Sequence, residues 1–171
     1  MNKLIATVVA IVSLSGVLCA ADTVSTTDSS PVGHLNLTLS GNGLSDLKTH
    51  DNGIGVTLGL SQEGLVWEPL EAGVRQSIAY QSEGNDVQGR TALFGDWNVP
   101  VAKKLVAFVG WQADGTYGQG TSFTWRTGPE GGLKLFVADN AYLFGRVNYD
   151  LKLNGNAGDS VAYTLGIGLR F

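Results

Sequence analysis

The sequence contains little cysteine, little proline and no long apolar segment after its first residues. Among its 171 residues there are one cysteine, Cys19, and four prolines. We expect Cys19 to be removed with the N-terminal segment described below, so the remaining chain can form no disulfide bond, thiol nucleophile or cysteine-ligated zinc site. After residue 21 no segment approaches the roughly 18 consecutive apolar residues that indicate a membrane-spanning helix.

Basic residues are also scarce. The chain has 11 Lys and Arg against 15 Asp and Glu, which gives a net charge of −4. Removal of the N-terminal segment, which carries Lys3 and no acidic residue, leaves 10 basic and 15 acidic residues and a net charge of −5. The sequence shows no basic stripe or tail, which argues against nucleic-acid binding.

Residues 1–21 have the features of a secretory signal peptide. Lys3 supplies a positive charge, residues 4–18 are uncharged and mainly apolar, and the small residues Ala20 and Ala21 precede Asp22. The pattern predicts export and cleavage after Ala21. An uncleaved anchor is one alternative, but the apolar stretch is short for a spanning helix. A lipoprotein modified at Cys19 is another, but Leu18 is large for that cleavage site. Residues 22–31 are rich in Ser and Thr and are predicted to form a flexible periplasmic leader.

From residue 32 onward, large apolar residues alternate with small or polar ones, in segments separated by Gly, Asn and Asp. This alternation indicates β-strands. Eight strands are predicted, at about 32–41, 52–61, 70–81, 88–98, 104–114, 121–136, 140–152 and 161–171. A membrane protein built from strands must close into a barrel, because open edges in lipid leave unpaired backbone groups. The predicted fold is therefore all-β, an eight-stranded antiparallel up-and-down transmembrane β-barrel over residues 32–171.

An even number of strands places the first and the last strand's free ends, and so both chain termini, on one side of the membrane, the periplasmic side. Connections 62–69, 99–103 and 138–140 then lie in the periplasm, and short outer loops lie at about 42–51, 82–87, 115–120 and 153–159. Aromatic residues on the apolar face are expected to form belts at the two membrane interfaces. The outer belt comprises Tyr80, Trp111, Trp125, Tyr149 and Tyr163, and the periplasmic belt comprises Trp97 and Phe171.

The second face of the strands carries charges of nearly balanced sign. The interior of an eight-stranded barrel is only wide enough for side chains to fill. We therefore expect an ion-pair network in the lumen formed by Glu71, Arg75, Arg90, Asp96, Arg126, Glu130, Arg146 and Asp150. A gated ion path through rearranging pairs is the alternative to a satisfied polar core. Small inward residues leave room either for the arginines or for a narrow water path: Gly53, Gly55, Gly59, Gly166 and Gly168.

Alternation alone does not decide which face is inside, since a soluble lipocalin-like barrel would place the apolar face inward. The signal peptide, the aromatic belts and the last strand favour an apolar exterior. One residue, Gln76, interrupts the apolar face of the third strand.

The last strand alternates Tyr163, Leu165, Ile167, Leu169 and Phe171 with small or polar residues. It resembles the terminal strand by which outer-membrane barrels are recognised for assembly. The chain from residue 32 to 171 resembles the small porin-like outer-membrane β-barrel proteins, of the outer membrane protein A transmembrane-domain and outer membrane protein X type. The resemblance implies the outer membrane of a Gram-negative cell envelope, contact with lipid, lipopolysaccharide and the barrel-assembly machinery, and roles in membrane integrity, surface contact or narrow-pore conductance.

The residues offer little evidence of catalysis or metal binding. Some eight-stranded outer-membrane barrels modify lipid A with a His, a Ser and a carboxylate. Here His34 is predicted to face inward near the periplasmic end, and His50 lies in a loop beside Asp51. Scattered loop acids lack the spacing of an EF-hand. We expect no enzyme, cofactor or metal site; a structural or interaction role is the first hypothesis, a narrow pore the second and a lipid A-modifying enzyme the third.

Overall fold

The structure is a computed structural model that describes residues 33–47, 52–64, 66–81, 86–118, 123–154 and 158–171, without the side chains of Asp46 and Asp86. All of them belong to the second of two units into which the chain divides, Pro31–Phe171. The predicted signal peptide and leader lie outside the described residues, as do His50, Asp51 and Glu83. No helix among the described residues is long and apolar enough to cross a membrane.

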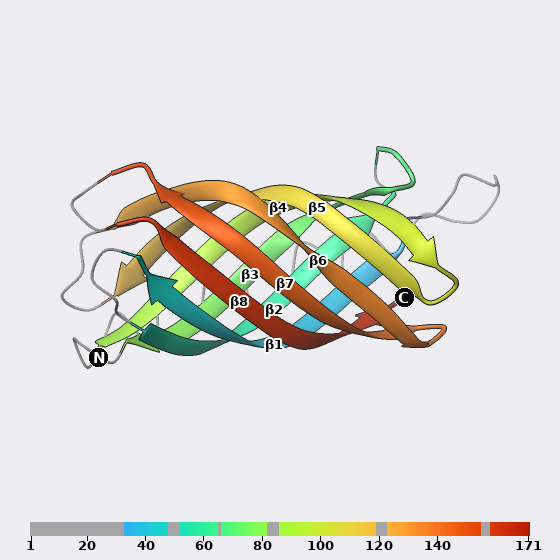
Figure 1. The fold of residues 1–171 in the computed structure, drawn as a ribbon, viewed down its shortest axis with the longest axis horizontal. Coiled ribbons are helices and arrows are strands. Elements are labelled where there is room, and N and C mark those ends of the chain that lie inside the picture. The colour runs from blue at the N-terminus through green and yellow to red at the C-terminus, as the bar shows by residue number, and fades with distance from the viewer. Residues whose placement is uncertain (1–32, 48–51, 65, 82–85, 119–122, 155–157) are drawn as a thin grey trace, which may run out of the picture. The chain divides into compact units, whose positions relative to one another are not determined.

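Eight β-strands form one closed barrel, in which each strand pairs antiparallel with its sequence neighbours and the last pairs with the first (Figure 1). The strands are β1 (Leu35–Asp46), β2 (Asn52–Glu63), β3 (Leu70–Gln81), β4 (Asp86–Ala102), β5 (Leu105–Gly118), β6 (Thr124–Ala138), β7 (Ala141–Lys152) and β8 (Ser160–Arg170). The predicted fold class is confirmed. We call the end with connections 64–69, 103–104 and 139–140 the turn end, and the opposite end the loop end.

Several strands are longer than the sequence predicted. β1 continues to Asp46 instead of residue 41, and β5 continues to Gly118 instead of residue 114. Both predictions ended strands at glycines, but Gly41, Gly43 and Gly115 all pair within the sheet. β4 likewise passes through Pro100 to Ala102, with a register shift between these residues. The predicted turn at 99–103 is therefore only the short connection after Ala102.

The strands are staggered around the barrel. On β6 and β7 the pairs Thr127–Leu151 and Glu130–Asn148 place Gly128 opposite Asp150. A row of paired residues that starts at Asn36 on β1 then passes once through every strand and returns to β1 at Asp46. The stagger is therefore ten residues, from 36 to 46. A stagger of this size requires strands that tilt strongly from the barrel axis.

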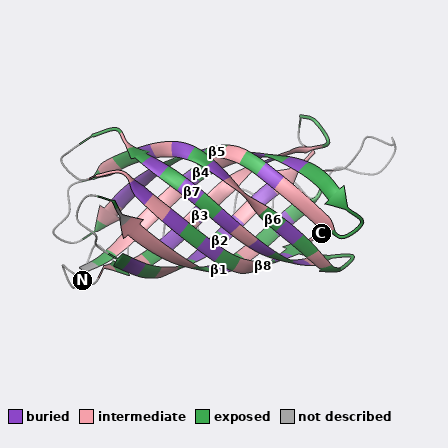
Figure 2. Cartoon of the chain, in the orientation of Figure 1, coloured by how far each residue is buried: buried purple, intermediate pink, exposed green. Residues whose placement is uncertain are grey.

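Burial is the reverse of that in a soluble protein (Figure 2). Among the described residues only five hydrophobic side chains are buried, but twenty polar or charged side chains are buried. The outside carries large apolar residues, of which Leu165 and Ile54 are 75% and 73% exposed. The polar face of the strands therefore lies inside, as the sequence favoured, and the lipocalin-like arrangement is excluded.

Two aromatic side chains on β7 fill the space over the inward glycines of β8. A Cβ atom added to Gly168 would lie 2.1 Å from the Tyr142 ring, and one added to Gly166 would lie 2.8 Å from the Phe144 ring. Tyr142 is 2% exposed and Phe144 is 8% exposed. The inward glycines were predicted to leave this space for arginines or for a narrow water path. The prediction is wrong for these two glycines, because it did not consider the inward aromatic residues of β7.

Candidate functional site: the charged interior of the barrel

Glu71 on β3 is the centre of a polar cluster nearest the turn end. Its carboxylate pairs with the Lys134 ammonium group and accepts a hydrogen bond from the Ser61 hydroxyl. The Asn98 amide donates to Glu71 at 3.3 Å, while its oxygen accepts from Lys134 Nζ at 2.9 Å. Glu71 is 3% exposed and Lys134 is 7% exposed. Hydrogen bonds and an opposite charge thus satisfy a carboxylate whose burial would otherwise be costly.

Arg75 occupies the middle of the interior. Its Nη1 atom lies 2.8 and 2.6 Å from the two carboxylate oxygens of Glu130, and its Nη2 atom lies 3.2 Å from Asp96 Oδ2. The guanidinium group also stacks on Phe94, 3.3 Å from the ring centroid. Arg146 contributes a second cation, with its Nε atom 3.6 Å from Glu130. A planar guanidinium group suits this combination of two carboxylates and one ring face.

A third cluster lies toward the loop end. Arg90 Nη2 is 2.6 Å from Asp114 and 2.8 Å from Asp150. Asp150 also accepts hydrogen bonds from Gln112 at 2.6 Å and from Asn148 at 2.8 Å. Gln112 joins this cluster to the middle one, because its oxygen accepts from Arg75 at 3.4 Å.

The structure therefore places all eight predicted network residues in the interior and brings seven of them into ion pairs. Arg126 is also buried, and its Nη1 atom donates to the Ser160 hydroxyl at 3.4 Å. The predicted network omitted four residues that form ion pairs: Asp114, which pairs with Arg90, Lys134, which pairs with Glu71, and Arg170 and Glu63, which pair with each other near the turn end. Asp114, Lys134 and Arg170 lie at inward positions of the alternation, and this was the signal from which they could have been included in the network.

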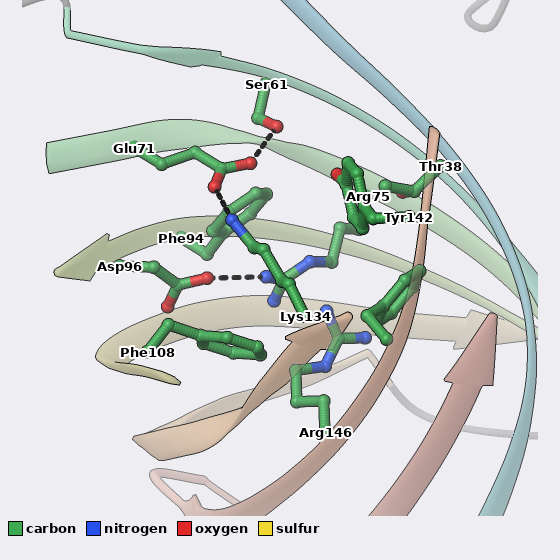
Figure 3. A pocket seen from close by; sticks show the side chains of 11 residues that line it. Thr38, Ser61, Glu71, Arg75, Phe94, Asp96, Phe108, Lys134, Tyr142 and Arg146 are labelled. Atoms are coloured by element: carbon green, nitrogen blue, oxygen red, sulfur yellow. Dashed lines mark hydrogen bonds and ion pairs between the residues drawn. The ribbon is translucent and has the colours of Figure 1, made fainter. Parts of the chain in front are cut away.

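The interior holds little free space. A cavity of about 20 Å³ lies beside Glu71, Arg75 and Lys134, and Figure 3 shows these side chains, the first two on β3 and the third on β6, around it. Another of about 20 Å³ lies toward the loop end, beside Arg90 and Arg126. Each volume is enough for about one water molecule. The hydrogen bonds of Gln112 to Arg75 and Asp150 connect the linings of the two cavities, so side chains lie between them.

The predicted belt residues are exposed on the outside of the barrel, but they are not all at strand ends. Tyr80, Trp125, Tyr149 and Tyr163 lie near the loop end of their strands, and Trp97 and Phe171 lie toward the turn end. Trp111 lies in the middle of β5 instead of at its outer end, because β5 continues to Gly118. Its indole N–H donates to the Thr127 hydroxyl at 2.7 Å.

His34 was predicted to face inward. It precedes β1 and is exposed, while its backbone oxygen accepts a hydrogen bond from the Glu63 N–H at 2.8 Å. The prediction failed because the strand begins only at Leu35, so the alternation does not extend to His34. Within the described ranges, no group of three or more His, Cys, Asp or Glu residues is arranged to hold a metal ion.

A closed eight-stranded antiparallel barrel with an apolar outside and a charged, filled interior has the architecture of the small transmembrane β-barrels. The crystal structure of Neisserial surface protein A matches with a TM-score of 0.63 and 11% identity, over 84% of this chain and 100% of that one. The N-terminal β-barrel domain of Pseudomonas aeruginosa OprF matches with a TM-score of 0.54 and 14% identity, over 81% and 99%. A de novo designed transmembrane β-barrel matches with a TM-score of 0.55 and 14% identity, over 85% and 100%.

No protein family and no curated protein matches the sequence. At the identities above, the likeness concerns the fold, and it confirms the resemblance to small outer-membrane barrels that the strand pattern predicted.

Proposed function

We propose that this chain is an integral outer-membrane β-barrel protein with a structural or interaction role at the cell envelope. The observation that carries the proposal is the reversed burial: large apolar side chains cover the outside, and charged side chains fill the inside. In water such an exterior would aggregate, since soluble monomers rarely expose large contiguous apolar patches. In a bilayer the same exterior faces hydrocarbon, and the closed ladder leaves no strand edge unpaired.

In the proposed orientation the turn end lies in the periplasm and the loop end lies outside. Bacterial barrels of this kind have short periplasmic turns and longer external loops, and the connections at 103–104 and 139–140 are the shortest in this chain. The outward residues of β8 and the terminal residue after it would be presented to the assembly machinery: Tyr163, Leu165, Ile167, Leu169 and Phe171. All five are exposed.

The filled interior supports a structural role over transport. The three clusters around Glu71, Arg75 and Arg90 connect opposite walls of the barrel and leave cavities of only about 20 Å³. Such contacts stiffen the wall, because each buried charge is held by partners on other strands. We expect membrane lipid, lipopolysaccharide or another surface molecule to interact with the outside of the barrel and its external loops.

Electrophoresis of the outer-membrane fraction with and without boiling tests this proposal. A closed barrel resists detergent until it is heated, so we expect the apparent mass to change on boiling. Flotation of the refolded chain with lipid vesicles provides the second measurement. A chain that stays soluble in the periplasm and shows no change on boiling would refute the membrane assignment.

A narrow pore is the second candidate. The observation that favours it is the pair of small polar cavities at different heights in the interior. Conduction would require the contacts between Arg75, Gln112 and Asp150 to separate, because they join the two cavity linings. Single-channel recording in planar bilayers measures this directly. A catalytic role has the least support, because His34, the histidine that the structure describes, is exposed outside the charged interior.

A further inference from the structure

Three polar side chains form a ring on the outside of the barrel, where most outward residues are apolar. Gln76 on β3, Thr91 on β4 and Tyr117 on β5 point outward by the alternation of their strands, and Gln76 pairs with Thr91 in the ladder. Gln76 Nε2 lies 2.8 Å from Tyr117 Oη, and Thr91 Oγ1 lies 2.7 Å from Gln76 Oε1. Thr91 Oγ1 and Tyr117 Oη are 3.2 Å apart and close the ring.

The ring uses its hydrogen-bond donors internally. Thr91 donates to Gln76 Oε1, so the Tyr117 hydroxyl supplies the proton of the third contact. The Gln76 amide donates to Tyr117 Oη and to the backbone oxygen of Ser77 at 3.3 Å. An amide oxygen and a hydroxyl oxygen each have two lone pairs. The ring therefore offers acceptors, and no spare donor, to a molecule beside the barrel.

A second outward group on the same side of the barrel has the same property. Trp111 Nε1 donates to Thr127 Oγ1 at 2.7 Å, and the Thr127 hydroxyl donates to the backbone oxygen of Gln112 at 2.8 Å. The Thr127 oxygen again keeps a lone pair while its proton is engaged. Thr127 and the ring of Gln76, Thr91 and Tyr117 thus share one chemical preference, which is for a hydrogen-bond donor.

The ring lies below the membrane interface in the proposed orientation. Gln76 is four residues from the belt residue Tyr80 toward the turn end, which corresponds to about 10 Å along the axis of a barrel with tilted strands. This depth belongs to the upper part of the outer-leaflet hydrocarbon. Water is scarce there, so a complementary donor would come from a lipid chain or from another protein.

We propose that the ring of Gln76, Thr91 and Tyr117 binds an outer-leaflet lipid whose acyl chain carries a hydroxyl or amide N–H group near its head. The inference rests on the proposed membrane function and adds the chemical class of the lipid. A second copy that packs ring against ring is a poorer occupant, because it would present the same acceptors without a donor. Tyr117 is already in place, since its ring covers Gly89, where an added Cβ would lie 2.4 Å away.

The test compares two lipids on the folded full chain in detergent micelles by native mass spectrometry. The probes are a β-hydroxyacyl amide glycolipid and its counterpart with an ester in place of the amide and without the hydroxyl. One neutral hydrogen bond corresponds to about 0.5–1.5 kcal/mol, so we expect about a two- to tenfold preference for the first lipid. The triple variant Gln76→Leu, Thr91→Val, Tyr117→Phe should remove the preference. Gln62→Leu, an outward glutamine on β2, is the matched control and should retain it.

Each outcome has one meaning. Preference in the native chain and in the Gln62→Leu control, with loss in the triple variant, supports the site. Equal binding of both lipids by the native chain overturns it, and so does preference that survives in the triple variant. A dimer that forms without lipid and disappears in the triple variant would assign the ring to a second copy instead. Failure of the native chain to float with vesicles would refute the membrane function itself, which flotation shows independently of lipid preference.

Discussion

Replacement of Arg75 by alanine should both destabilise the barrel and open its interior. Arg75 lies between Asp96 and Glu130 and pairs with both at 3.2 and 2.6 Å. Among the described residues it is the one cation paired with Asp96, whose Oδ1 atom has no hydrogen-bond partner even in the native chain. Glu130 would keep only the longer contact with Arg146, at 3.6 Å. The variant therefore leaves one buried carboxylate unpaired and a second one weakly paired.

Removal of one partner from a buried ion pair typically lowers stability by about 3–5 kcal/mol. We expect a loss of that size in the free energy of unfolding of Arg75→Ala. The double variant Arg75→Ala, Asp96→Asn removes the unpaired carboxylate and leaves Glu130 paired with Arg146, so it should recover most of the loss. Both variants lack the guanidinium group that lines the 20 Å³ cavity and contacts Gln112. Both should therefore admit more water, and conductance should rise in each of them.

Urea unfolding in micelles, followed by tryptophan fluorescence, measures the stability, and planar-bilayer recording measures the conductance. The double variant separates the two readouts, because it restores the charge balance of the cluster without refilling the space that Arg75 occupied. A loss below about 1 kcal/mol in Arg75→Ala would show that the pairs are not buried as described. Unchanged conductance in both variants would show that Arg75 does not close a path.

Two further predictions test the packing and the membrane-facing surface. Gly168→Ala should lower stability by about 1–3 kcal/mol through overpacking, because its Cβ would lie 2.1 Å from Tyr142. Gly41→Ala should instead be neutral or raise stability by up to about 1 kcal/mol, since no atom lies within 4 Å of its Cβ. Equal urea midpoints for the Gly168→Ala and Gly41→Ala variants would contradict this difference. Leu165→Arg should cost about 2–4 kcal/mol in vesicles and Leu153→Arg, beyond the loop end of β7, about 0–1. A soluble barrel would show almost no effect at either position.

The inside and outside faces were predictable because a strand has a period of two. The alternation of Leu37 and Leu39 with Asn36 and Ser40 needs no knowledge of distant contacts, and burial follows it residue by residue. Strand ends were less predictable. A glycine such as Gly41 weakens a strand and often marks a bulge or turn, but here both neighbouring strands pair with it.

Ion-pair partners were not predictable from the alternation. Arg75 and Glu130 are 55 positions apart, and Lys134 and Glu71 are 63 apart. These pairs cross the interior, so they depend on the stagger of the strands and on the heights at which side chains meet. Sequence period fixes the face of each residue, whereas the closed register fixes its partner. The inward rings of β7 were missed for a related reason, since their space is provided by glycines on another strand.

The outward ring is the place where the local rule of alternation fails. Gln76 interrupts an apolar face that is otherwise continuous along β3, and the structure shows that Thr91 and Tyr117 on two further strands surround it. A sequence usually departs from its own pattern at strained or functional positions. A polar side chain toward hydrocarbon is unfavourable unless its hydrogen bonds are satisfied, and the ring satisfies its donors while it leaves acceptors available. We therefore expect molecular recognition by this barrel to involve its outer surface, where the ring offers hydrogen-bond acceptors to a donor.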